Sequence, residues 1–195
     1  MPNRAKRTRG PRISAQSPTK KSFTFKKSER PAGWTEEDER DWIESGPRTY
    51  DKAKWHYEGD YPKGLPKAQA FVHTGLFTGW LIERNMIDRR FTRQFSREFP
   101  VFTKQFKQRK LTGPQVYKMW GGCLHDEMLT PEANQFAQEY YDGDGFWKDY
   151  RKLLVKRLPS WYHVQDTWAN YDILAPQIDA RYEAWKSQGK AKGRT

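Results

Sequence analysis

Apolar residues along this chain of 195 residues recur mostly at steps of three and four, which is the spacing of one face of an α-helix. The clearest stripe, in the segment 166–186, comprises Trp168, Tyr171, Ala175, Ile178, Tyr182 and Trp185. Another, in the segment 67–85, comprises Ala68, Val72, Gly75, Leu76, Gly79 and Trp80. No stretch of similar length alternates with period two. The pattern predicts a mainly α-helical, compact domain of several helices, with at most a short strand or hairpin near residues 49–57.

Capping residues and prolines mark the predicted helix ends. Helix starts are expected at Thr35 with Asp38, at Thr112 with Pro114, and at Thr130 with Pro131. The first of these helices is expected to end at Gly46 and Pro47. In the last helix, Asp166 is expected to act as the N-terminal cap, and Pro176 to bend the helix or restart it.

Glycines and phenylalanines predict where helices pack. Gly75 and Gly79 lie one turn apart, and each costs about 1 kcal/mol of helix propensity relative to Ala, so we expect a backbone or a bulky ring to approach closely there. Five phenylalanines form one apolar stripe, Phe91, Phe95, Phe99, Phe102 and Phe106. Because Pro100 interrupts it, we expect a kink or two helices that meet at Phe99 and Pro100.

The formal net charge of +12 is confined to the ends of the chain. Residues 1–34 hold ten Lys or Arg against one acid, residues 187–195 hold three basic residues, and residues 35–186 are neutral. Residues 1–34 also lack apolar periodicity, so we expect a disordered basic N-terminal tail, a globular domain over 35–186, and a basic C-terminal tail over 187–195.

A flexible basic arm attracts phosphates, so the N-terminal tail is a candidate for nonspecific nucleic-acid binding. Its candidate residues are Arg4, Lys6, Arg7, Arg9, Arg12, Lys20, Lys21, Lys26 and Lys27. The alternative is that the tail only increases solubility.

Cysteine content and hydropathy bear on the compartment. Cys123 is the only cysteine, which excludes an intramolecular disulfide and a cysteine-rich zinc site. The sequence has no apolar run of the ~20 residues that a membrane span needs and no secretory signal pattern. We therefore expect a cytoplasmic protein without membrane association.

Two clusters of aromatic, imidazole and carboxylate side chains are candidates for one pocket. The candidate pocket residues are Trp55, His56, Glu58, Asp60, His73, Trp161, His163 and Asp166. The alternative is that the aromatic residues are core and that each histidine is satisfied locally. The four histidines show no paired spacing such as HExxH, so the sequence does not favour a metal site, and we predict no cofactor and no catalytic residue.

Several ordered strings resemble a bacterial family that is known only as a domain of unknown function. The strings are WHYEGDYPKGLP, HTGLFTGW, EANQFAQEYYD and LPSWYHVQDTW, and the resemblance extends over roughly residues 50–186. No reaction, cofactor or catalytic residue is implied by it.

Three functions are compatible with these observations. The first is a noncatalytic interaction protein that binds a protein partner, of which a toxin-neutralising immunity protein is one form by analogy alone. The second is association with nucleic acid through the basic tail. The third is an enzyme whose pocket joins at least two of His56, His73 and His163.

Overall fold

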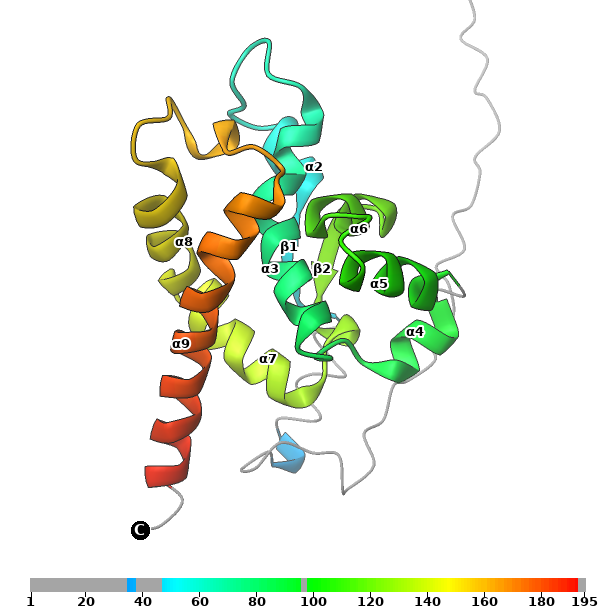
Figure 1. Cartoon of the computed structure of the whole chain (residues 1–195). Coiled ribbons are helices and arrows are strands. Elements are labelled where there is room, and N and C mark those ends of the chain that lie inside the picture. Colours follow the sequence, from blue (N-terminus) through cyan, green and yellow to red (C-terminus); the bar gives the residue numbers. More distant parts are fainter. Residues whose placement is uncertain (1–34, 38–46, 96–97, 193–195) are drawn as a thin grey trace, which may run out of the picture.

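The computed structural model describes residues 35–37, 47–95 and 98–192, and it is mainly helical with one small antiparallel sheet (Figure 1). The strands are β1 (Thr49–Lys52) and β2 (Cys123–His125). The α-helices are α2 (Ala53–Tyr57), α3 (Val72–Glu83), α4 (Arg89–Phe95), α5 (Phe99–Lys107), α6 (Gly113–Met119), α7 (Pro131–Ala137), α8 (Gly145–Tyr150) and α9 (Trp168–Lys192). Short 3-10 segments are η2 (Lys67–Phe71), η3 (Asp126–Met128) and η6 (Trp161–His163), and π-helical turns are η4 (Gln138–Asp142) and η5 (Arg151–Val155).

Helix α3 forms the centre of the molecule. Every residue from Val72 to Ile82 is buried, which is the pattern of a helix covered on all sides. In Figure 1, α8 and α9 lie on one side of α3, and α4, α5 and α6 lie on the other. The core around α3 is rich in aromatic side chains, including Phe77, Trp80, Tyr117 and Phe146. Such residues bury large areas each, which explains how a chain poor in aliphatic residues forms a core.

The close approach predicted at the glycines of α3 is present. A Cβ atom built on Gly75 would lie 2.2 Å from the Cα atom of Pro114 in α6, and one built on Gly79 would lie 3.0 Å from the ring of Phe106. The backbone carbonyl of Gly75 in turn leaves no room for a side chain on Gly113. The glycines therefore allow α3 and α6 to pack backbone against backbone.

The strand region differs in part from the expectation. Only residues 49–52 are extended, and their partner is β2, some seventy residues further along, with Asp51 opposite Leu124. Residues 53–57 form α2 instead, which begins at Ala53, where the backbone amide donates to the carbonyl of Gly122. His56 is therefore on a helix and not on an extended segment.

The other predicted boundaries are largely reproduced. Thr112 caps α6 and Thr130 caps α7 through their hydroxyl groups. The phenylalanine stripe forms two helices, and Pro100 lies in the first turn of the second. The restart expected at Pro176 is wrong, since α9 continues through it, with Leu174, Ala175 and Ile178 buried around the proline. Asp38, the expected partner of Thr35, and the predicted N-terminal tail over 1–34 lie outside the described residues, whereas α9 continues through residues 187–192 of the predicted C-terminal tail.

Within the described part of the chain, no helix has the length and apolar character needed to cross a membrane.

Candidate functional site

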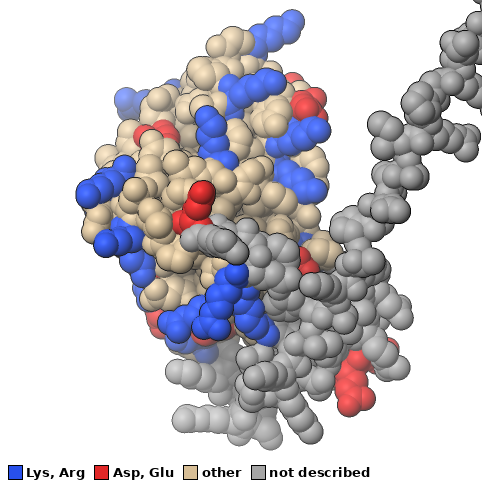
Figure 2. Space-filling view, turned by 90° about the vertical axis from the view of Figure 1, so that its right-hand side faces the viewer, with Lys and Arg blue, Asp and Glu red and all other residues tan. Residues whose placement is uncertain are grey.

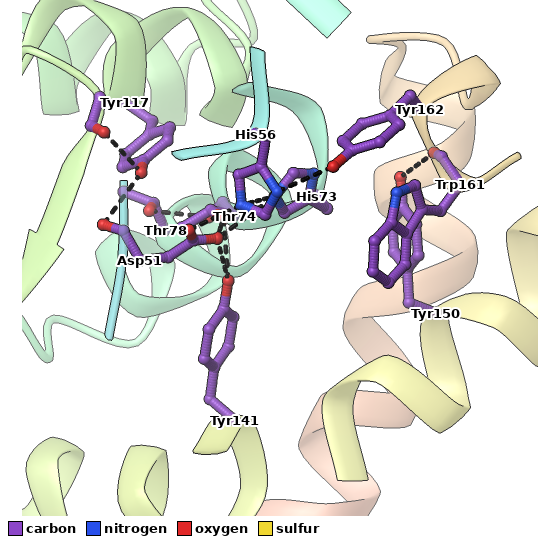
Figure 3. Close-up of polar contacts among 11 residues, drawn as sticks. Asp51, His56, His73, Thr74, Thr78, Tyr117, Tyr141, Tyr150, Trp161 and Tyr162 are labelled. Carbon is purple, nitrogen blue, oxygen red and sulfur yellow. Dashed lines mark hydrogen bonds and ion pairs between the residues drawn. The ribbon is translucent and has the colours of Figure 1, made fainter. Parts of the chain in front are cut away.

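Three polar side chains from three elements converge beside the sheet (Figure 3). Asp51 comes from β1, His56 from α2 and His73 from the first turn of α3. The Nε2 atom of His56 lies 2.7 Å from Asp51 Oδ1 and 3.1 Å from His73 Nε2. His73 Nε2 lies 3.2 Å from Asp51 Oδ2. We call these three residues the Asp51 cluster.

The carboxylate of Asp51 is held in one orientation by further donors. The Thr74 hydroxyl donates to Oδ2, and so does the Tyr141 hydroxyl at 2.9 Å. The Tyr117 hydroxyl lies 3.4 Å from the backbone carbonyl oxygen of Asp51 and donates to the carbonyl of Gly122 at 2.8 Å. Because Thr74 follows His73 on α3, one turn of that helix supplies two groups that contact the same carboxylate.

The cluster keeps a negative charge inside the protein. The Asp51 side chain is only 5% exposed, so burial alone would raise its pKa, but the hydrogen bonds from His56 and His73 outweigh burial and hold the pKa far below its usual range. Burial lowers the pKa of His73, whose side chain is 1% exposed. The site therefore contains an ionised carboxylate beside a neutral His73 imidazole.

His56 connects the cluster to the surface. Its Nδ1 atom lies 3.0 Å from the hydroxyl oxygen of Tyr162, so both ring nitrogens are engaged and the ring orientation is fixed. The His56 side chain is 16% exposed, whereas His73 is enclosed by aromatic rings, among them Trp147 and Trp161. Solvent or a ligand can thus reach His56 but not His73.

A pocket of about 420 Å³ opens beside His56. It is lined by Trp55, His56, Asp60, Pro62, Ser160, Trp161 and Tyr162. Trp55 is 55% exposed, which is high for a tryptophan and leaves one wall of the pocket apolar and accessible. The segment after α2 and the segment around η6 therefore meet as two walls of one pocket, with His56 between them.

Comparison with known sequence families identifies the family of the chain. The sequence model of the domain of unknown function DUF7832 matches residues 49–164. The chain belongs to this family. No curated protein and no solved structure matches the chain. The family resemblance expected from the sequence is confirmed, although the match ends before α9, and all three members of the Asp51 cluster lie inside the matched DUF7832 region.

The candidate pocket residues predicted from sequence have different positions in this DUF7832 domain. Trp55, His56, Asp60 and Trp161 line the pocket, and His73 lies directly behind His56. The other three do not line it. Glu58 forms an exposed ion pair with Lys54, His163 Nδ1 lies 2.9 Å from Ser160 Oγ, and Asp166 accepts a hydrogen bond from Thr112.

The expected capping role of Asp166 is therefore wrong. Thr167 is the residue whose hydroxyl accepts from the Asn170 amide at the start of α9. Asp166 instead accepts from the Thr112 hydroxyl at the start of α6, at 2.8 Å. The carboxylate thus ties the entrance of α9 to that of α6.

Sequence reasoning missed Asp51, Thr74 and Tyr141. Asp51 lies in the string YDKAK, which has no ligand or catalytic spacing, and its partners are 5, 22, 23 and 90 residues away. Only the pairing of β1 with β2 and the packing of η4 against α3 bring them together. The one available signal was the position of a charged residue in a predicted strand that also holds an apolar neighbour, Tyr50.

The Asp51 cluster of the DUF7832 domain can perform two kinds of chemistry. A carboxylate that orients an imidazole can assist proton transfer to a group in the pocket. Alternatively, one oxygen and two imidazole nitrogens that face one point can coordinate a metal ion. Both use the same atoms.

Proposed function

We propose that this DUF7832 domain is an enzyme, a hydrolase, that acts on a small substrate in the pocket beside His56. The observation that carries the proposal is that the buried carboxylate of Asp51 holds two imidazoles, one of which forms part of the pocket wall. Hydrolysis needs a group that activates water next to a bound substrate, and an oriented imidazole or a metal ion provides it.

The pocket supports a small-molecule substrate. Its volume lies within the usual range for such sites, roughly 300–1,000 Å³. The Trp55 and Trp161 rings supply flat apolar walls, and Asp60 and Ser160 supply hydrogen-bonding groups. These walls favour a substrate with a planar apolar part and a hydrogen-bond donor.

An interaction protein, the first expectation from sequence, stays a prediction. A surface that only binds a protein partner does not require a buried carboxylate with two imidazoles, because buried charges are costly unless they are paired. The Asp51 cluster supports the enzyme alternative more directly for this reason. Recovery of a specific protein partner by the full chain, together with no turnover of any substrate class, would favour the interaction protein instead.

A hydrolysis screen tests the proposal. The full chain is assayed against p-nitrophenyl acetate, p-nitrophenyl phosphate, bis-p-nitrophenyl phosphate and aminoacyl p-nitroanilides. We expect turnover of at least one class, a loss of at least about 100-fold in kcat for His56→Gln, and a raised KM for Trp55→Ala.

The matched control for Trp55→Ala is Ile173→Ala, because Ile173 is an apolar residue on α9 that is 50% exposed and lies outside the pocket. It should retain wild-type kinetics. The proposal fails if no class is hydrolysed faster than in buffer, or if His56→Gln hydrolyses as fast as the wild type.

Association with nucleic acid is a second candidate function, which the charge of α4, α5 and α6 supports. Exposed basic residues in this region include Arg89, Arg93, Lys104, Lys107, Lys110 and Lys118, and Glu98 is an exposed acid among them. Figure 2 views this side of the molecule and shows more Lys and Arg than Asp and Glu on the atoms that are not grey. A folded basic face of this kind would add to the attraction of the N-terminal tail for phosphates.

The two sources of positive charge can be separated with a fluorescein-labelled DNA duplex. We compare the full chain, a variant without residues 1–34, and the variant Lys104→Glu with Lys107→Glu and Lys110→Glu. Lys152→Glu with Lys156→Glu, two exposed lysines of another region, serves as the control. Anisotropy at 50 and 200 mM salt should show binding that weakens steeply with salt and with the substitutions at Lys104, Lys107 and Lys110. Equal binding by all four proteins would exclude both basic regions as the binding site.

A further inference from the structure

We infer that the Asp51 cluster binds one divalent first-row transition-metal ion, with Asp51 Oδ1, His56 Nε2 and His73 Nε2 as its ligands. The inference deepens the proposed function, because it names the cofactor of the same pocket, and it rests on that function only for the role of the ion in catalysis. Binding of the ion itself is argued from the geometry alone.

The spacing of the three ligand atoms fits a metal ion. A metal that binds oxygen and imidazole nitrogen at about 2.1 Å, with angles of 90–109°, places its ligand atoms about 3.0–3.4 Å apart. The two Nε2 atoms lie 3.1 Å apart, and His73 Nε2 is 3.2 Å from Asp51 Oδ2, the other oxygen of the same carboxylate. The third pair, His56 Nε2 with Asp51 Oδ1, is 2.7 Å apart and needs to open by a few tenths of an ångström.

If both imidazoles are neutral, the hydrogen atoms of the cluster cannot all be placed in favourable contacts. A neutral imidazole carries one N–H, so His56 must place it on Nε2 to donate to Asp51. If His73 also carries its proton on Nε2, two N–H groups face each other at 3.1 Å. If His73 carries it on Nδ1, its Nε2 lone pair faces the carboxylate, and the buried Nδ1–H has no hydrogen-bond partner in the described part of the chain.

A bound cation removes the conflict at the two Nε2 atoms, while the His73 Nδ1–H still has no hydrogen-bond partner in the described part of the chain. The cation accepts the Nε2 lone pairs of both imidazoles and one lone pair of Asp51 Oδ1, so both rings carry their proton on Nδ1. The Nδ1–H of His56 then donates to the Tyr162 oxygen, which lies 3.0 Å away, and the Tyr162 hydroxyl turns its own proton away. A ligating histidine commonly donates its other N–H in this way.

Neighbouring residues already orient the carboxylate as a metal ligand requires. Thr74 and Tyr141 both donate to Asp51 Oδ2, which leaves Oδ1 directed at His56. Such outer contacts fix the orientation of ligating carboxylates and histidines in metalloproteins. Among the polar side-chain atoms of the cluster, only His73 Nδ1 lacks a hydrogen-bond partner in the described part of the chain. The contacts to the other atoms distinguish the cluster from a chance contact of three polar residues.

The ligand set identifies the class of metal and the type of site. Two imidazoles and one carboxylate suit Zn²⁺, Fe²⁺, Mn²⁺ or Co²⁺, whereas Ca²⁺ and Mg²⁺ prefer oxygen ligands alone. Among the described residues three ligands converge and not four. Structural zinc sites are usually closed by four protein ligands, while catalytic sites keep a position for water or substrate. His56 lines the pocket, so that position can be filled from it.

Direct metal binding tests the inference without reference to activity. Untagged full-length protein is stripped with EDTA, dialysed, and titrated with Zn²⁺ by calorimetry, and Co²⁺ is used as a probe because its visible absorption reports coordination. We expect one equivalent of metal per chain and a Co²⁺ spectrum that Zn²⁺ abolishes by competition.

Variants assign the binding to the cluster. Asp51→Asn and His56→Gln should each weaken Zn²⁺ binding by at least about 100-fold, and Tyr162→Phe by about 10-fold, because outer contacts contribute about 10- to 100-fold. His163→Gln is the matched control, since His163 lies near the pocket but contacts Ser160. Circular dichroism of each metal-free variant checks the fold, and His56→Gln, at the partly exposed ligand, keeps the test valid if Asp51→Asn does not fold.

The inference is overturned if the wild type takes up less than one equivalent of both Zn²⁺ and Co²⁺, or if His56→Gln binds Zn²⁺ as tightly as the wild type. The outcomes also separate the two proposals. Metal binding without any hydrolysis would refute the proposed function and leave the metal site standing. Hydrolysis by the EDTA-stripped protein at the wild-type rate would refute the metal inference for catalysis and leave the hydrolase standing.

Discussion

The substitutions Gly75→Ala and Gly79→Ala provide a graded test of how α3 is packed. The two glycines lie one turn apart in the same buried helix, so each substitution gains the same helix propensity, about 1 kcal/mol. They differ in what the new methyl group meets. At Gly75 it would lie 2.2 Å from Pro114 Cα and 2.6 Å from Pro114 N, and both of these atoms belong to the backbone of α6.

At Gly79 the contacts are milder. The methyl group would lie 3.0 and 3.1 Å from ring atoms of Phe106 and 3.2 Å from the ring of Tyr171. Side chains can move by a few tenths of an ångström, whereas relief at Gly75 requires α6 to move by about an ångström in a close-packed interior. Overpacking costs about 1–3 kcal/mol, so we expect a net loss of about 2 kcal/mol for Gly75→Ala and a change within about 1 kcal/mol for Gly79→Ala.

Urea unfolding followed by tryptophan fluorescence measures both variants. With an m-value of about 2 kcal/mol/M, the midpoint of Gly75→Ala should fall by about 1 M and that of Gly79→Ala should change by less than about 0.5 M. A Gly75→Ala protein as stable as Gly79→Ala would show that α3 and α6 do not pack backbone against backbone.

Two carboxylates should give opposite pH effects on stability. Hydrogen bonds from Arg181 outweigh burial and hold the pKa of Asp149 below its usual value. The contribution of ionised Asp149 to the free energy of unfolding is therefore present above about pH 4 and lost as the pH falls through the folded pKa. Asp149→Asn should make the free energy of unfolding depend less on pH in the acid range. Burial raises the pKa of Asp166, so the free energy of unfolding falls as the pH rises through the folded pKa and the carboxylate ionises. Asp166→Asn should therefore leave the protein equally or slightly more stable at pH 7. Marked destabilisation of this variant at pH 7 would contradict the expected direction of the effect. Thr112→Ala removes the cap of α6 and the donor to Asp166, and thermal unfolding should show a loss of about 1–2 kcal/mol that Thr103→Ala, at an exposed hydroxyl on α5, does not.

Local signals predicted the helices of this protein well, because caps and close contacts are encoded by neighbouring residues. The hydroxyls of Thr112 and Thr130 accept from amides three residues further on, so their roles follow from sequence spacing alone. The glycines of α3 were equally informative, since a glycine in a buried helix has a propensity cost that needs a packing reason.

Tertiary contacts decided the features that were predicted incorrectly. A proline removes one backbone hydrogen bond, and this favours a break only if the residues on either side are free to separate. In α9 the side chains of Leu174, Ala175, Ile178 and Tyr182 are all buried against the core, so the helix continues through Pro176. The short strand expected near residues 49–57 is present but ends at Lys52, and its partner β2 lies about seventy residues further along, so the local sequence does not reveal where the pairing stops.

The same limitation applies to the candidate site. His56 and His163 each follow an aromatic residue, and the sequence offers no reason to treat one as part of a cluster and the other as a local contact. What separates them is Asp51, which β2 fixes opposite Leu124 and which then meets His56 at the end of the next turn. The His163 ring contacts the hydroxyl of Ser160, three residues before it. A metal or catalytic centre whose ligands come from three elements has no characteristic spacing, so in this fold the pairing of two short strands determines which histidine acquires a carboxylate partner.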